Sequence, residues 1–123
     1  MSAYANATRG YQQSSILTAL PEKLVVMLYD GARRFLLQGA AAERAGDIQG
    51  SNERLGRAEA IIDELLATLD MSAGEVAERL QALYVFFKRT LLEARTERSP
   101  EKIEQVSDLM GELRDSWAQL GGA

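Results

Sequence analysis

Residues 18–32 read Thr-Ala-Leu-Pro-Glu-Lys-Leu-Val-Val-Met-Leu-Tyr-Asp-Gly-Ala. Pro21 followed by Glu22 is typical of the first turn of an α-helix, because proline costs no hydrogen bond there and an acidic residue suits the positive end of the helix dipole. The pattern predicts a helix over residues 21–45, ended by Gly46. Leu20 is a poor N-cap, so either Thr18 caps this helix or the preceding segment packs against its start.

This first predicted helix is apolar on more than one face. An amphipathic helix needs an apolar stripe only about 100° wide. Here the apolar residues fall in three directions: Leu24, Leu28 and Phe35 form one stripe, Val25, Met27 and Leu36 flank it, and Val26, Tyr29 and Leu37 point a third way. A chain of 123 residues offers little interior for such a helix. We therefore expect the helix to face a second apolar partner, which predicts a protein that binds another protein.

Three further helices follow, and each has a recognisable start. Asp47, the capping-box pair Ser72 and Glu75, and Ser99 before Pro100 mark these starts. Apolar residues then recur at spacings of three and four: Ile48, Leu55, Ala58, Ile62, Leu65 and Leu69; Val76, Leu80, Leu83, Tyr84, Phe87 and Leu91; Ile103, Val106, Met110, Leu113, Trp117 and Leu120. The connections are short, so successive helices run antiparallel. The sequence therefore predicts an all-α fold, an antiparallel up-down-up-down four-helix bundle over residues 18–123.

Residues 1–17 differ from the rest of the chain. They are small and polar without helical periodicity, apart from the apolar side chains of Tyr11, Ile16 and Leu17. Terminal segments are usually loose unless they are tied down. We expect an N-terminal arm that docks conditionally against an exposed groove.

The composition argues against most catalytic and cofactor chemistry. Fourteen Lys and Arg against eighteen Asp and Glu give a net charge of −4 without a basic run, which disfavours a nucleic-acid partner. The chain has no Cys and no His, so thiolate or histidine metal sites and the commonest nucleophile and general base are missing. No apolar run approaches the roughly 20 residues of a membrane span, and no signal segment is present. We expect a cytoplasmic protein with no cofactor, no metal, no catalytic residues and no membrane insertion.

One stretch is specific enough to compare with known families. It consists of Tyr11, followed by Thr18-Ala19-x-Pro21-Glu22-x-Leu24-x-x-Met27-Leu28-Tyr29-Asp30-Gly31-Ala32. Further along the chain, the comparable residues are Asn52, Leu65-Leu66-x-x-Leu69-Asp70, Leu80-x-x-Leu83-Tyr84 and Leu113-Arg114-x-x-Trp117. In these residues the chain resembles the FliS family of flagellin-specific export chaperones of bacteria. Leu20 departs from the family, which usually has a capping serine before the proline.

The resemblance implies a helical bundle that binds the C-terminal segment of flagellin in the cytoplasm. Such a chaperone prevents premature polymerisation and delivers the subunit to a component of the flagellar type III export gate. A bundle with surplus apolar surface is suited to this task, because it can bury the apolar face of a client helix in a groove. In the family, the N-terminal arm covers part of this groove when no client is bound, and Tyr11, Ile16 and Leu17 match that arm.

Eight residues are the candidates for partner binding: Tyr11, Ile16, Leu17, Val25, Val26, Tyr29, Leu36 and Phe86. The residues on the first helix also fit an ordinary core or the seam of a homodimer formed by the free protein. Tyr84 and Phe87 fit the core at helical spacing, whereas Phe86 lies off the main stripe and suits a groove. Trp117 fits either the core or a binding anchor at the end of the bundle.

Two other functions remain open at this stage. One is a structural homodimeric adaptor that binds no client. The other is a small all-helical enzyme of the chorismate-mutase type, in which Arg and Lys side chains converge on an anionic substrate. The candidates Arg33, Arg34, Arg79, Lys88 and Arg89 fall mostly on predicted solvent faces, which argues against the enzyme.

Two local features of the first helix have structural explanations. Asp30 and Arg34 are spaced as an i,i+4 ion pair, and Asp30 could instead orient a neighbouring helix. Gly31 and Gly39 each cost about 1 kcal/mol in a helix relative to Ala, which suggests close approach of another helix. That helix belongs either to the bundle or to a client.

Overall fold

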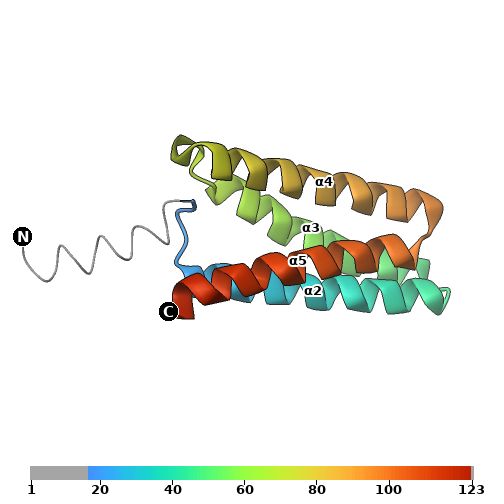
Figure 1. The fold of residues 1–123 in the computed structure, drawn as a ribbon. Coiled ribbons are helices and arrows are strands. Elements are labelled where there is room, and N and C mark those ends of the chain that lie inside the picture. Colours follow the sequence, from blue (N-terminus) through green and yellow to red (C-terminus); the bar gives the residue numbers. More distant parts are fainter. Residues whose placement is uncertain (1–16, 123) are drawn as a thin grey trace, which may run out of the picture.

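The structure is a computed structural model that describes residues 17–122. Four long helices make up the fold: α2 (Glu22–Arg44), α3 (Ile48–Thr68), α4 (Glu75–Glu97) and α5 (Pro100–Gly122). A short 3-10 turn, η1 (Met71–Ala73), joins α3 to α4. Consecutive helices run antiparallel (Figure 1), so the predicted up-down-up-down four-helix bundle is confirmed.

The core lies around α2, which packs along α3 on one side and α5 on the other. The buried apolar residues of α2 are Val25, Tyr29, Ala32, Leu36 and Ala40, which recur at three- and four-residue spacing. They meet the buried stripes of the other helices, which include Leu55, Ala58, Ile62 and Leu65 of α3, Tyr84, Phe87 and Leu91 of α4, and Ile103, Val106, Met110 and Trp117 of α5. This arrangement makes α2 the central helix of the bundle.

Two of the predicted helix caps are confirmed and one is wrong. The Asp47 side chain accepts a hydrogen bond from the Gly50 amide (2.9 Å), and the Ser99 hydroxyl accepts one from the Lys102 amide (3.2 Å). Ser72, however, does not open α4. Its amide donates instead to the Asp70 carboxylate (3.0 Å), which is the N-cap of η1.

Helix α4 begins two residues after the 3-10 turn, with Gly74 as its N-cap. Gly74 has a φ of 91°, in the region that favours glycine. The predicted capping box fails because the backbone turns sharply at this glycine. Ser72 and Glu75 therefore belong to different elements.

Residues 17–20, here called the strap, tie the start of α2 to the end of α3. The Ala19 amide donates to the Thr68 carbonyl (2.9 Å), and the Asp70 amide donates to the Leu17 carbonyl (3.0 Å). The Thr18 hydroxyl accepts from the Leu20 amide (3.3 Å) rather than from an amide of α2. Thr18 is therefore not the cap of α2, and the alternative that the preceding segment packs at this end holds.

Gly39 marks a close approach inside the bundle. A Cβ atom at Gly39 would lie 3.1 Å from Cδ2 of Leu55 on α3, whereas one at Gly31 would lie 3.5 Å from Cδ1 of Ile61, an ordinary contact. Asp30 does not pair with Arg34: its carboxylate lies 2.9 Å from Nε of Arg114, so the ion pair joins α2 to α5. The i,i+4 prediction is wrong, and the helix-orienting alternative for Asp30 is the one observed.

Candidate binding groove

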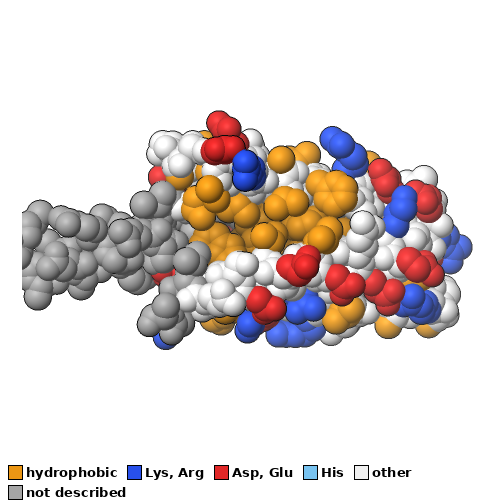
Figure 2. All heavy atoms as spheres, in the orientation of Figure 1, with side chains coloured by type: hydrophobic (Ala, Val, Ile, Leu, Met, Phe, Trp, Pro, Cys, Tyr) orange, Lys and Arg blue, Asp and Glu red, His pale blue; other side chains and the backbone are white. Residues whose placement is uncertain are grey.

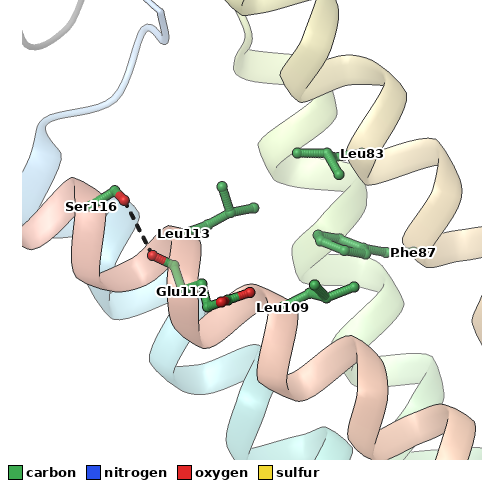
Figure 3. A pocket seen from close by; sticks show the side chains of 6 residues that line it. All are labelled: Leu83, Phe87, Leu109, Glu112, Leu113 and Ser116. Atoms are coloured by element: carbon green, nitrogen blue, oxygen red, sulfur yellow. Dashed lines mark hydrogen bonds between the residues drawn. The ribbon is translucent and has the colours of Figure 1, made fainter.

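A groove runs between α4 and α5. It is lined by Leu83 and Phe87 from α4 and by Leu109, Glu112, Leu113 and Ser116 from α5, and it encloses a volume of about 200 Å³. Figure 3 shows Leu83 and Leu113 projecting from opposite sides into the space between the two helices. Most of its lining is aliphatic or aromatic, which suits an apolar ligand surface.

The two helices that line the groove separate toward one end of the bundle and are joined by ion pairs at the other. The axes of α4 and α5 separate toward the start of α4 and the end of α5, near the strap (Figure 1). At the opposite end, Nζ of Lys102 on α5 lies 2.7 Å from Glu97 and 3.1 Å from Glu93 on α4. Val76 in the first turn of α4 is 52% exposed although it lies on the flank that carries Leu80 and Leu83. The open end therefore leaves apolar surface uncovered.

Beneath this groove, α4 is held to the central helix by a pair of tyrosines. The hydroxyl oxygens of Tyr29 and Tyr84 lie 2.5 Å apart, and both side chains are buried. Burial raises the pKa of the Tyr29 phenol, and the neighbouring Tyr84 raises it further. Burial also raises the pKa of Tyr84. Both phenols are neutral at physiological pH, so they link the two helices as hydrogen-bonded neutral groups.

An exposed aromatic side chain extends the apolar surface on the α4 side. Phe86 is 39% exposed, and its ring centroid lies 6.2 Å from that of Phe87 in a tilted arrangement. Figure 2 shows hydrophobic side chains gathered in one continuous area between α4 and α5 on this face. Contiguous apolar surface of this kind commonly marks an interaction site.

Three of the sequence-predicted binding residues lie in the core instead. Val25 is 1% exposed, and Tyr29 and Leu36 are fully buried. The prediction that these side chains form a surface is wrong, because α2 is central and is covered by α3 on one side and α5 on the other. A partner would reach them only if the bundle opened.

The other predicted residues are placed differently. Phe86 is exposed beside the lining residue Phe87, while Val26 and Leu17 are half-buried and pack against the core cluster. Tyr11 and Ile16 lie outside the described residues. None of the described candidates is among the residues that line the α4–α5 groove, and Phe86 is the exposed candidate that lies next to one of them, Phe87.

Sequence reasoning missed the residues that form the groove. The apolar spacing places Leu83 and Leu113 in core stripes and does not single out Leu109. A signal existed, because Leu109 and Leu113 form an i,i+4 pair displaced to one side of the Val106, Met110 and Trp117 stripe. This second apolar row makes the apolar face of α5 wider than a core stripe requires.

No catalytic arrangement accompanies the groove. The described residues contain no group of three or more acidic, histidine or cysteine side chains that could hold a metal ion. Within residues 17–122, no helix is long and apolar enough to cross a membrane. The candidate cations of the enzyme alternative are dispersed: Arg79 pairs with Glu75 and Lys88 pairs with Asp63. What the groove offers is mostly apolar contact.

Comparison with known proteins defines the class of protein. The family model described as "Flagellar protein FliS" matches residues 4–123. The chain is 33% identical over 117 residues to the flagellar secretion chaperone FliS of Bacillus subtilis (strain 168), covering 95% of this chain and 87% of the relative. It is 34% identical over 122 residues to the protein of the same name from Salmonella typhimurium, covering 94% and 90%. The corresponding protein of Vibrio cholerae is 35% identical over 108 residues.

The chain therefore belongs to the FliS family. This is a family of flagellar export chaperones and not of enzymes, so the enzyme alternative is set aside.

Proposed function

We propose that this chain is a cytoplasmic type III export chaperone that binds the C-terminal segment of flagellin in the α4–α5 groove. The observation that supports this most directly is the groove itself: a mostly apolar groove of about 200 Å³, with Phe86 exposed beside its lining residue Phe87. A helix-binding groove needs this combination of apolar floor and accessible rim.

The proposed mechanism is protection by burial. A flagellin segment that packs through an apolar helix face in a filament has that face unsatisfied in the free subunit. Seating that face against Leu83, Leu109 and Leu113 removes it from water and so prevents premature polymerisation. Ordering of the segment on binding costs entropy, which keeps the complex reversible. The complex can then deliver flagellin to a component of the flagellar export gate.

Residues 1–16 are the proposed occupant of the groove when no client is bound. The strap fixes residue 17 at the end of the bundle where the groove opens (Figure 1). Sixteen residues can span at most about 55 Å, which exceeds the roughly 35 Å length of a 23-residue helix such as α5. In this proposal Tyr11 and Ile16 supply the apolar contacts of a conditionally docked N-terminal arm, and a client displaces them.

The test is calorimetric titration of the full chain with a peptide from the C-terminal segment of flagellin of the same organism. We expect 1:1 binding with a negative heat-capacity change, which is the signature of apolar burial. Phe86→Asp should weaken binding at least about tenfold, because it places a charge on the apolar rim. Leu113→Asp should weaken it more, and its helicity must be checked because Leu113 is half-buried.

The matched control is Leu92→Asp. Leu92 is 63% exposed on α4 and is not among the residues that line the groove, so this variant should bind the peptide like the unmodified chain. If Phe86→Asp and Leu92→Asp bind the peptide equally well, the client binds elsewhere, which would contradict the proposal that it binds in the α4–α5 groove. Absence of any binding, with light scattering showing a homodimer that ignores the peptide, would favour the structural adaptor instead.

A further inference from the structure

The two sides of the groove differ in charge. On the α5 side, Asp108 and Glu112 are exposed one helical turn apart, and neither has an ion-pair partner among the described residues. Glu112 is itself part of the groove lining. Asp115 follows on the same helix and is paired with Arg114, an ion pair that is largely exposed. Figure 2 shows acidic side chains along α5, next to the apolar area.

The α4 side carries no corresponding excess of acid, because the exposed Glu75 and Glu78 are balanced by the exposed Arg79 and Arg89. Arg79 and Glu75 neutralise each other as an i,i+4 pair with 2.7 Å between Nη2 and Oε1. Phe86 supplies an uncharged rim, and Arg89 lies three residues beyond it. An occupant therefore meets a net negative charge along the α5 flank only.

We infer that the groove selects an amphipathic helix with Lys or Arg along the flank that faces α5 and uncharged residues along the flank that faces α4. This rests on the proposed function and specifies the chemistry of its client. Because most of the groove lining is apolar, hydrophobic contact alone does not fix how a helix is rotated about its own axis. Charge on one side fixes that rotation, since the reversed orientation places cations beside Phe86 and leaves Glu112 without a partner.

The expected contribution to affinity is modest. Exposed ion pairs are weak individually, and they are screened within about 8 Å at physiological salt. Electrostatic complementarity of this kind acts mainly on specificity and association rate. The inference therefore predicts a difference between matched ligands rather than strong binding by charge.

The experiment uses two synthetic amphipathic peptides of about 18 residues, which corresponds to five helical turns. Both carry the same Leu and Ala face; one has Lys along a single flank and the other has Glu at the same positions. We expect the full chain to bind the Lys peptide about tenfold more tightly at low salt, with the difference shrinking at about 1 M salt, where the screening length is about 3 Å.

Charge reversal locates the effect on the protein. Glu112→Lys should reduce the preference for the Lys peptide at least about threefold. Glu64→Lys is the matched control, because it makes the same change in net charge at an exposed position on α3, away from the α4–α5 groove. Glu64→Lys should retain the preference of the unmodified chain.

The outcomes separate this inference from the proposed function. Equal affinities for the two peptides, no binding of either peptide, or equal effects of Glu112→Lys and Glu64→Lys would overturn the inference. If the flagellin peptide still binds and Phe86→Asp still weakens it, the proposed function stands without the charge selection. If the flagellin peptide does not bind either, both fail.

Discussion

The hydroxyl oxygens of Tyr29 on α2 and Tyr84 on α4 lie 2.5 Å apart in the interior of the bundle. Their ring centroids are 6.4 Å apart at an angle of 46°, so the side chains meet through their hydroxyl groups rather than by stacking. This hydrogen bond joins the central helix to the helix that carries Leu83 and Phe87. It therefore helps to fix the α4 side of the groove relative to the core.

Removing one of these hydroxyl groups should lower the free energy of unfolding by more than half of the loss that follows when both are removed. Tyr84→Phe leaves the Tyr29 hydroxyl buried without this partner, which we expect to lower the free energy of unfolding by about 1–3 kcal/mol. The double variant Tyr29→Phe/Tyr84→Phe leaves no such unpaired group, so its loss should be smaller than the sum of the two single losses. Urea unfolding followed by the fluorescence of Trp117, the only tryptophan, measures all three. If the losses of unfolding free energy in the two single variants add up to the loss in the double variant, the hydrogen bond does not couple Tyr29 to Tyr84.

The same tyrosine pair predicts a loss of stability at alkaline pH. Burial raises the pKa of both phenols above the ordinary value of 10.0, while unfolding returns them to that value. Above pH 10 the unfolded chain therefore releases protons that the folded chain retains, so stability is full below about pH 10 and falls as the pH rises further. The slope of unfolding free energy against pH should be shallower in the Tyr29→Phe/Tyr84→Phe variant. Identical slopes would mean that both phenols titrate normally in the folded chain.

Most of the fold follows from local sequence signals. The two prolines, the Asp47 and Ser99 caps and the three- and four-residue apolar spacing predict four helices, and the first of them, predicted over residues 21–45, is observed as Glu22–Arg44. The α4 start was the exception. There the Asp70 carboxylate competes for the Ser72 amide, and the positive φ of Gly74 turns the chain, so the capping box does not form. Such competition between caps is not visible in a spacing pattern.

The groove was harder to predict than the fold. Periodicity shows how wide the apolar surface of a helix is, but it does not show which part of that surface a neighbouring helix covers. On α2, the wide apolar surface is covered by neighbouring helices, so Tyr29 and Leu36 are buried. On α4 and α5 the separation of the helix axes leaves Leu109 and Leu113 only half-buried. That separation is a tertiary property, which the sequence of a single helix does not specify.

Two glycines should respond oppositely to substitution. Gly39→Val would push a branched side chain into Leu55, whose Cδ2 already lies 3.1 Å from the position of the first added carbon. We expect this change to lower the free energy of unfolding by about 1–3 kcal/mol. Gly56→Ala is the control: its nearest neighbour is Nη2 of Arg95 at 3.8 Å, so better helix propensity should stabilise by up to about 1 kcal/mol. Thermal melts compare them, and stabilisation by Gly39→Val would contradict close packing of α2 on α3.

Charge insertion distinguishes the core from the groove. Tyr29→Asp and Leu65→Asp each place an unpaired carboxylate among buried apolar side chains, at 0% and 3% exposure. The cost of several kcal/mol is comparable to the roughly 5–15 kcal/mol that hold a domain together, so both variants should lose most of their helicity. Phe86→Asp should remain folded, because its carboxylate stays in water on the rim of the groove. Circular dichroism melts of the three variants decide the matter. A folded Tyr29→Asp would place this residue at an accessible surface, whereas an unfolded Phe86→Asp would make the rim part of the core.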